Sequence, residues 1–321
     1  MTPALGKHVW RGLLIAVLLA VTPAVVFAQA NKDFQAGVTA AKAGKLDHAI
    51  QLFTQAIEVG TLGKEDLARV YNSRGATYVR MQKLDLAISD FTRAIKLKPK
   101  YFQALVNRAE AYGKKGKWEG AEEDYALALR EKPQEISIFI DRAKMRADRN
   151  RLDTAIDDIN EVLRLQLRHD KALALRGKYF RKQGRYFRAV EDFSAAIQLK
   201  GSDPSYYAER GLTLAYMEKY RDALADMDHA AGMGSVGPDH FYYRGLIHGA
   251  LGDHTKAWLD YNRAIEMKPD YVAAIYARAV AAVGADDLNR AREDSVRVLE
   301  LDPGHQGAER LLHRLDNPPQ R

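Results

Sequence analysis

An alanine returns at a fixed interval along most of this chain. After one step of 38 residues, every later step in the series is 34 residues. The eight members are Ala49, Ala87, Ala121, Ala155, Ala189, Ala223, Ala257 and Ala291. A constant period of this length is typical of stacked helix–turn–helix repeats, in which each repeat packs only on its neighbours. Such an array forms a long surface rather than a globule around one pocket, so the period favours a binding scaffold.

The pattern within one period indicates two helices joined by a polar turn. In the second repeat, Tyr71, Gly75 and Tyr78 follow the i, i+4, i+7 spacing of one helical face. Ala87 and Phe91 begin the same pattern on a following helix. The position of Gly75 is always small, although Gly inside a helix costs roughly 1 kcal/mol relative to Ala. The eight residues there are Gly37, Gly75, Ala109, Ala143, Gly177, Gly211, Gly245 and Ala279. We therefore expect the two helices of each repeat to approach closely at this point.

These residues resemble the tetratricopeptide repeat family. So does a proline that closes four of the repeats, at Pro99, Pro133, Pro269 and Pro303. The resemblance covers about residues 30–305 and implies an all-α, right-handed α–α superhelix, or solenoid, of eight helix–turn–helix repeats plus a C-terminal capping helix. The repeats are expected at residues 30–67, 68–101, 102–135, 136–169, 170–203, 204–237, 238–271 and 272–305. A capping helix is expected at 306–316 and a disordered tail at 317–321, because a terminal repeat needs a cover for its open face.

The first residues have the pattern of a secretory signal peptide. Lys7 and Arg11 precede an apolar run at residues 13–21, and small residues follow up to Ala28. We predict a signal peptide at 1–28, cleaved after Ala28 or after Ala30, with an uncleaved anchor as the alternative. The chain has no cysteine, so disulfides are excluded. The sequence thus predicts an exported protein, in the periplasm or otherwise outside the cytoplasm, with no transmembrane span after cleavage.

The sequence offers no pattern that indicates catalysis. The G-x-G-x-x-G run at 232–237 lies between predicted helices, not after a strand, so we interpret it as a helix end and a loop. The nine histidines show no metal-ligand spacing; His240 and His248 lie on one predicted helix, and His248 occupies an interior position. We expect no enzyme activity, no cofactor and no metal. The formal net charge of +7 weakly favours acidic partners or anionic envelope surfaces, but not nucleic acid.

Paired charges recur in seven repeats. The first helices hold Arg74, Arg108, Arg142, Arg176, Arg210, Arg244 and Arg278. Sixteen residues after each arginine, the second helices hold Asp90, Asp124, Asp158, Asp192, Asp226, Asp260 and Asp294. Because the two helices run antiparallel, we interpret these as structural Arg–Asp pairs that fix helix register. The alternative is that the arginine column binds a ligand.

The family resemblance also implies a concave groove lined by outward residues of the first helices. Carried onto this sequence, the ligand-binding groove comprises Arg69, Asn72, Arg80, Lys114, Lys144, Lys171, Lys178, Arg181, Lys182, Tyr216, Tyr242, Leu246 and Tyr276. Its early and middle members are mostly basic, and its late members are aromatic or apolar. We expect a protein or peptide partner, an extended acidic segment or a component of an envelope assembly. The alternatives are ordinary solvated surface, an anionic envelope polymer as the ligand, and a scaffold that self-associates; the oligomeric state stays open.

Overall fold

The computed structural model describes residues 23–234 and 236–317, and all regular secondary structure in these ranges is helical. Residues 1–22 of the predicted signal peptide and 318–321 of the predicted tail lie outside them. The helices are α1 (Pro23–Lys42), α2 (Leu46–Glu58), α3 (Lys64–Arg80), α4 (Leu84–Leu97), α5 (Phe102–Lys114), α6 (Trp118–Glu131), α7 (Ile136–Asp148), α8 (Leu152–Leu165), α9 (Asp170–Lys182), α10 (Tyr186–Leu199), α11 (Pro204–Tyr216), α12 (Tyr220–Gly232), α13 (Pro238–Ala250), α14 (His254–Met267), α15 (Val272–Gly284), α16 (Leu288–Leu301) and α17 (Gln306–Asp316). The prediction of an all-α repeat array is confirmed.

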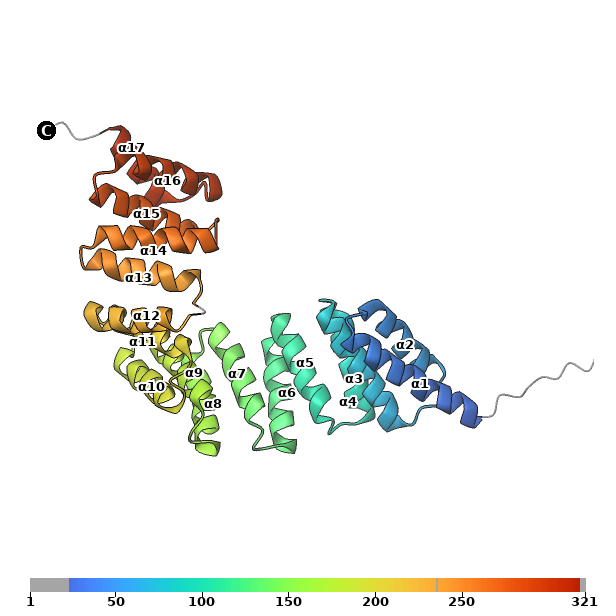
Figure 1. Cartoon of the computed structure of the whole chain (residues 1–321). Helices are drawn as coiled ribbons and strands as arrows, with labels where there is room; N and C mark the ends of the chain where they lie inside the picture. Colours follow the sequence, from blue (N-terminus) through green and yellow to red (C-terminus); the bar gives the residue numbers. More distant parts are fainter. Residues whose placement is uncertain (1–22, 235, 318–321) are drawn as a thin grey trace, which may run out of the picture. The chain divides into compact units, whose positions relative to one another are not determined.

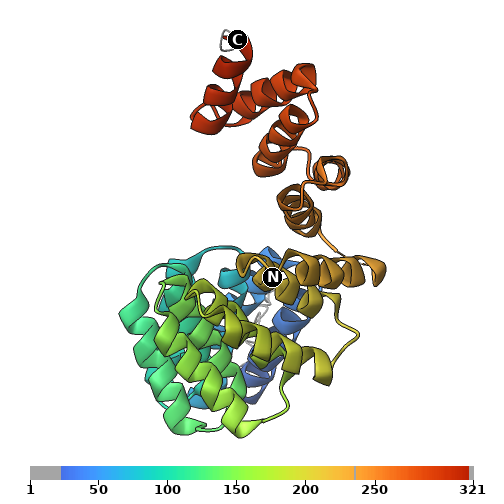
Figure 2. The ribbon, with the colours of Figure 1, turned by 90° about the vertical axis from the view of Figure 1, so that its left-hand side faces the viewer.

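The helices belong to two compact units, one that ends at Pro133 and one that begins at Gln134. The first unit contains α1–α6 and the second α7–α17. Within each unit, helices pair as hairpins in chain order, and each hairpin packs on the next (Figures 1 and 2). The first helix of each hairpin carries an odd number up to α15, and the second an even number.

Two helices start earlier than the sequence pattern suggests. α1 begins at Pro23 and runs through both predicted cleavage sites, and Ala30 within it is fully buried. α3 begins at Lys64, four residues before the expected start of the second repeat. The longer step between the first two alanines of the series is thus taken up by the loop and helix start that precede Ala68.

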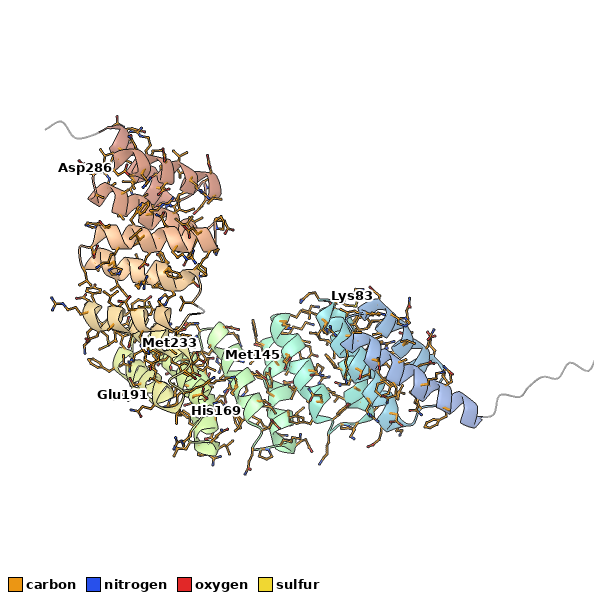
Figure 3. All side chains as sticks on the ribbon, viewed as in Figure 1. Lys83, Met145, His169, Glu191, Met233 and Asp286 are labelled. Atoms are coloured by element: carbon orange, nitrogen blue, oxygen red, sulfur yellow. The ribbon has the colours of Figure 1, made fainter. Side chains whose placement is uncertain are left out.

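Each hairpin turn contains one residue with left-handed backbone. These residues are Gly44, Gln82, Gly116, Asn150, Gly184, Glu218, Gly252 and Asp286, with φ between 58° and 81°. In the α3–α4 turn, the N–H of Gln82 donates to the carbonyl of Val79, and the N–H of Lys83 donates to that of Tyr78. These bonds satisfy carbonyls that the helix end leaves unpaired. Lys83 and Asp286 mark two of the turns in Figure 3. The repeated geometry explains why all the turns have one length.

Where the small residue of a first helix is glycine, it faces a large residue of the second helix. A Cβ added at Gly75 would lie 2.7 Å from Cε1 of Phe91, and one added at Gly245 would lie 2.6 Å from Cε1 of Tyr261. Real Cβ atoms do not approach ring atoms this closely, so glycine is a steric requirement at these two positions. The large residues themselves are core: Phe91 and Tyr261 are buried.

The C-terminal helix α17 covers the last hairpin with one face. Ala308 and Leu311 are buried against it, while Glu309, Arg310 and His313 are exposed. An apolar inner face with a polar outer face lets a repeat array end in water. Among the described helices, none is long and apolar enough to cross a membrane.

Candidate functional site

The seven arginines of the first helices contact the seven aspartates of the second helices. Each arginine donates from Nε and Nη2 to the two carboxylate oxygens of its aspartate, at 2.6–3.1 Å. This two-bond geometry is the strong form of an arginine–carboxylate contact. The aspartates are 1–8% exposed, so both of their oxygens are committed inside the hairpin. In the fourth repeat, Asp158 also accepts from Nη1 of Arg146 at 2.8 Å.

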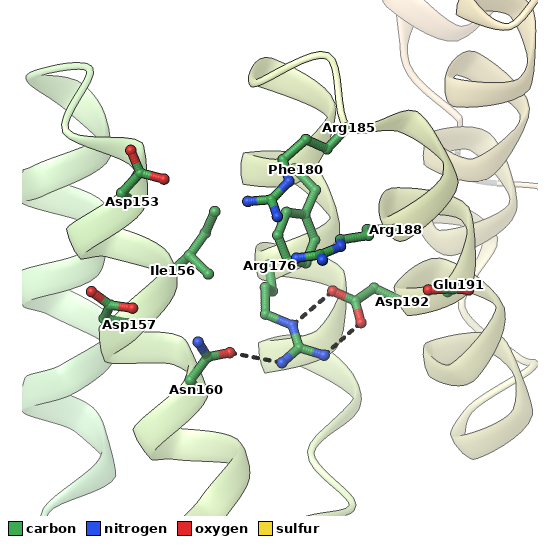
Figure 4. Close-up of a pocket in the computed structure, with 10 residues that line it drawn as sticks. All are labelled: Asp153, Ile156, Asp157, Asn160, Arg176, Phe180, Arg185, Arg188, Glu191 and Asp192. Carbon is green, nitrogen blue, oxygen red and sulfur yellow. Dashed lines mark hydrogen bonds and ion pairs between the residues drawn. The ribbon is translucent and has the colours of Figure 1, made fainter.

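Six of these arginines also bind the second helix of the preceding repeat through Nη1. The acceptors are side-chain oxygens of Thr54, Thr92, Asn160, Ser194, Asp228 and Asn262. Figure 4 shows one example, in which Arg176 on α9 reaches Asp192 on α10 and Asn160 on α8. Each such guanidinium therefore joins three helices. In these six repeats the donors that a ligand would use already have partners within the protein.

Beside Arg176, an open depression of about 410 Å³ lies between α8, α9 and α10. Asp153 and Asp157 on α8 form one wall, and Arg185 and Arg188 face them across the ring of Phe180 (Figure 4). The mixed charge gives this depression no preference for either sign of ligand. Within the described parts of the chain, no group of three His, Cys, Asp or Glu side chains is placed to hold a metal ion.

In the first unit, the predicted groove residues differ in how far they face solvent. Arg69 is exposed and pairs with Asp66 at 3.1 Å. Lys114 is exposed, and Arg80 donates to the carbonyl of Ala41. Asn72 departs from the prediction: it is only 9% exposed, and its Oδ1 accepts from Nδ2 of Asn107 on α5 at 2.9 Å. Asn72 is thus a packed contact between α3 and α5 rather than an outward groove residue.

In the second unit, two predicted groove cations converge on one carboxylate. Nζ of Lys178 lies 2.6 Å from Oε1 of Glu209, and Nη1 of Arg181 lies 2.7 Å from Oε2 of the same group. Glu209 is on α11, so the cluster links the first helices of neighbouring repeats. Glu209 was not among the groove residues that the family resemblance implied. Nothing within a single repeat indicated that it would reach the two cations of the repeat before it.

The remaining predicted lysines of this unit lie on the surface. Lys171 and Lys182 are exposed on α9. Lys144 is exposed on α7, with its Nζ 3.7 Å from Asp141. Exposed lysines are therefore present on this surface, but Glu209 neutralises part of the charge at Lys178 and Arg181.

Tyrosines gather beside the Lys178–Arg181–Glu209 cluster. The ring of Tyr216, 54% exposed, stacks on Tyr186 with centroids 5.6 Å apart and planes 8° apart. Tyr242 lies 5.2 Å from the ring of Tyr243 and 5.3 Å from that of Tyr271. Burial raises the pKa of Tyr243, and so do the neighbouring Tyr216 and Asp239, while the charge of Arg181 lowers it. Tyr243, which was not among the predicted groove residues, thus lies within electrostatic reach of both Tyr216 and Arg181.

The last two predicted groove residues have different surroundings. Leu246 is 40% exposed on α13. Tyr276 on α15 lies 4.6 Å from the ring of His305 and packs so closely on the cap that a Cβ at Gly307 would be 2.7 Å from its hydroxyl oxygen. Tyr276 thus helps to seat α17, and the exposed apolar surface of the groove centres on Tyr216 and Leu246.

The chain is thus an array of helical hairpins. Arg–Asp pairs join the two helices of seven hairpins, and aromatic and charged side chains lie on an open face. These features define a repeat scaffold. Family models described as Tetratricopeptide repeat match residues 68–101, 140–204 and 209–272, just over half of the chain. The chain belongs to the tetratricopeptide repeat family. Proteins of this family commonly serve as scaffolds that bind other proteins.

Curated relatives match only part of this chain. The human mitochondrial import receptor subunit TOM70 is 42% identical over 74 residues, which are 23% of this chain and 12% of TOM70. The chloroplastic tetratricopeptide repeat domain-containing protein PYG7 of Arabidopsis thaliana is 39% identical over 88 residues, 27% of this chain and 29% of PYG7. The chain therefore spans less than a third of either relative.

Solved structures share the fold over a longer stretch. A tetratricopeptide repeat protein from Parabacteroides merdae superposes with a TM-score of 0.63 at 20% identity, covering 79% of this chain and 99% of that one. The Cut9–Hcn1 hetero-tetramer of APC/C contains a chain with a TM-score of 0.60 at 17% identity, covering 84% of this chain and 52% of that one. At these identities the likeness concerns the fold alone.

Proposed function

We propose that this protein binds an extended, acidic segment of a partner protein along the first helices α9, α11 and α13. The observation that carries this proposal is the cluster of Lys178 and Arg181 around Glu209. Lys178 and Arg181 on α9 both contact the carboxylate of Glu209 on α11, and a carboxylate of a ligand can occupy the same position. Glu209 thus occupies the position that an acidic side chain of the ligand would take.

Binding at this cluster exchanges the carboxylate of Glu209 for a carboxylate of the ligand. The side chain of Glu209 is 21% exposed and that of Lys178 is 44% exposed, so the cluster is open to a competitor from solvent. The Lys178–Glu209 pair, at this degree of exposure, contributes only about 0–1 kcal/mol. Arg181, whose side chain is 16% exposed, and the buried Oε2 of Glu209 are less accessible, so a ligand carboxylate reaches Lys178 first, and neighbouring Lys171 and Lys182 add long-range attraction.

The tyrosines beside the cluster supply an apolar anchor. Tyr216 presents over half of its surface, and Leu246 on the next first helix presents 40%. Aromatic residues are enriched at protein interfaces because they give large contact area at small cost in side-chain entropy. We therefore infer a ligand that has acidic residues near α9 and an aromatic or aliphatic residue near α11 and α13.

The exported location is part of the same proposal, and the predicted signal peptide supports it. Cleavage after Ala28 keeps the buried Ala30 in α1, whereas cleavage after Ala30 removes it. We therefore expect Gln29 as the first residue of the mature chain. N-terminal sequencing of protein recovered from the periplasm checks this, and recovery of the uncut chain in the membrane fraction would contradict it.

Binding is tested with three defined polymers: a random Glu–Tyr copolymer, polyglutamate and inorganic polyphosphate. We expect the fluorescent Glu–Tyr copolymer to bind most tightly. The double variant Lys178→Gln, Arg181→Gln should weaken it about tenfold, and Glu209→Gln should strengthen it several-fold because the cations lose their internal partner. The matched control Lys100→Gln, an exposed lysine of the first unit, should leave binding unchanged.

Each alternative has its own outcome. Equal, strongly salt-dependent binding of all three polymers would replace the peptide proposal with an anionic envelope polymer as the ligand. Unchanged binding in all variants would show that the cluster is ordinary surface. A mass that rises with protein concentration in sedimentation, and that the Tyr216→Ala change lowers, would favour self-association.

A further inference from the structure

The turn between α9 and α10 is followed by a phenylalanine that projects into solvent. Phe187 is 74% exposed, although Phe is normally among the most buried residue types. The corresponding residue near the start of the second helix is acidic in each of the first four repeats: Asp47, Asp85, Glu119 and Asp153. This turn therefore replaces a charged, solvated residue by a large apolar one.

Basic residues flank Phe187 in the sequence, and one comes from the next hairpin turn. The segment from residue 182 to 188 contains Lys182, Arg185 and Arg188 and no acidic residue. The three are exposed. Nζ of Lys219, from the α11–α12 turn of the next repeat, lies 6.0 Å from the centre of the Phe187 ring. Arg185 and Arg188 lie over the ring of Phe180, with Cζ 5.1 and 5.7 Å from its centre, and they leave the Phe187 ring accessible.

Other aromatic and apolar residues extend this surface along the turns. Tyr186 stacks on the exposed Tyr216, and Leu251 of the α13–α14 turn is 43% exposed beside Lys219 and Tyr220. Glu218 and Asp222 also lie there, so the charge of the α11–α12 turn is balanced, and the excess of positive charge comes from the segment 182–188 that contains Phe187. We call Lys182, Arg185, Phe187, Arg188 and Lys219 the turn patch.

We propose that the turn patch docks this protein onto the surface of a lipid bilayer with anionic headgroups. Phe187 would enter the boundary between headgroups and acyl chains, and the surrounding cations would contact lipid phosphates. Aromatic residues at the interface and basic residues above it are the pattern of proteins that lie on a membrane. Lys182 belongs to both surfaces, but Phe187, Arg185, Arg188 and Lys219 are not groove residues, so this inference rests on residues that the groove proposal does not use.

The shape of the patch favours a bilayer over a peptide. Phe187 does not line the depression between α8, α9 and α10, nor the one that contains Tyr220 and Leu251. The Phe187 ring projects from the protein and is not part of a hollow that could receive a peptide side chain, whereas a bilayer can deform around a projecting ring. One ring and four cations give a reversible attachment, since each basic residue near an anionic surface changes affinity about fivefold.

The test is co-sedimentation of the full chain with phosphatidylglycerol–phosphatidylcholine vesicles and with phosphatidylcholine vesicles. We expect binding to the anionic vesicles that decreases with salt. Phe187→Asp should lower the bound fraction at least tenfold, and Arg185→Gln with Arg188→Gln should lower the partition coefficient about 25-fold. The control Leu167→Asp also replaces an exposed apolar side chain by a carboxylate, at a residue that is 82% exposed in the α8–α9 loop, and it should have no effect. The N-terminal apolar segment is identical in all variants, so differences between them report on the patch.

A second readout does not depend on the bound fraction. Relative to the wild type, the Phe187→Trp variant should gain emission that shifts to the blue with anionic vesicles and is quenched by lipid brominated on its acyl chains. Equal vesicle binding by the wild type, Phe187→Asp and the arginine double variant would overturn the proposal. So would an unshifted emission of the tryptophan variant, or an effect of Phe187→Asp on the Glu–Tyr copolymer alone, which would make the patch a peptide site. Circular dichroism of each variant checks that it keeps its helices.

Discussion

Arg176 and Asp192 face each other across the α9–α10 hairpin and share two hydrogen bonds, of 2.8 and 2.7 Å. The aspartate side chain is 8% exposed and the arginine side chain is 24% exposed. Loss of either residue leaves the other charge partly buried without its partner. We expect Arg176→Ala and Asp192→Ala each to lower the free energy of unfolding by about 2–4 kcal/mol. The double variant should cost at least about 1 kcal/mol less than the sum of the two. Urea denaturation of the four proteins measures this coupling, and strictly additive losses would contradict the pairing.

Loss of the third contact of Arg176 should lower the free energy of unfolding by less than loss of the Asp192 pair. Asn160→Ala removes the acceptor of Nη1 on the preceding second helix but leaves the pair with Asp192 intact. We expect a loss of about 0.5–1.5 kcal/mol in the free energy of unfolding, the usual worth of one hydrogen bond. Asp157→Ala, on the exposed face of the same helix, is the control and should change stability by less than about 0.5 kcal/mol. If the two substitutions have equal effects, the contact adds nothing to the junction.

Steric contact at the small position predicts a destabilisation that a second change relieves. Gly75→Ala places a Cβ 2.7 Å from the ring of Phe91, so we expect a cost of about 1–3 kcal/mol from overpacking. The added change Phe91→Ile reproduces the Ala143 and Ile159 combination of the fourth repeat and should recover part of the loss. Gly232→Ala, where no atom lies within 4 Å of the new Cβ, should be neutral or stabilise by up to about 1 kcal/mol. Thermal unfolding of the three variants distinguishes steric cost from a general effect of alanine.

The hydrogen bond from the Tyr206 hydroxyl to Asp170 predicts a pH dependence. The bond is 2.7 Å long, and it holds the pKa of Asp170 below its ordinary value of 3.8. A carboxyl whose pKa is lower in the folded state stabilises the fold above its unfolded pKa, and this stabilisation is lost as the pH falls through the folded pKa. Tyr206→Phe should therefore be less stable than the wild type at pH 7, and the difference should shrink below about pH 4. A difference that stays constant down to pH 2 would show that the hydroxyl acts only by packing.

Burial of His240 predicts a loss of stability under mildly acidic conditions. Its side chain is 7% exposed at the start of α13, and burial lowers its pKa below 6.5, with Arg244 lowering it further and Asp260 raising it. The folded state thus binds this proton less readily than the unfolded chain does. The wild type should lose stability as the pH falls from about 6.5, and His240→Phe should lose less over the same interval. Denaturation midpoints at pH 7.5 and pH 5 measure the effect, and parallel losses in both proteins would assign it to other groups.

The spacing of Arg and Asp predicted the hairpin contacts because antiparallel helices of constant length place those positions opposite one another. The Nη1 acceptors were not predicted, although Thr92, Ser194 and Asn262 all stand sixteen residues before an arginine. Their residue types vary, and only their shared polarity marks the column.

The groove was less predictable than the hairpins. Family offsets state which residues point outward but not which side chains reach across to the next helix. Glu209 was not an expected groove residue, and it forms ion pairs with two of the cations that were expected to bind the ligand, Lys178 and Arg181. Asn72 was expected to face outward, and its amide instead packs on Asn107. Both differences arise because neighbouring repeats interact through side chains that a single repeat does not specify.

The arginine that joins three helices has a consequence for how such a chain can grow. A repeat that makes all three contacts offers a donor on its first helix and an acceptor on its second, so either end of it fits any other repeat of the same kind. Duplication or deletion of a 34-residue block within the second unit would rejoin a donor to an acceptor without any compensating change. The number of repeats can then change by duplication or deletion at little cost in stability, while the outward-facing residues are free to diverge.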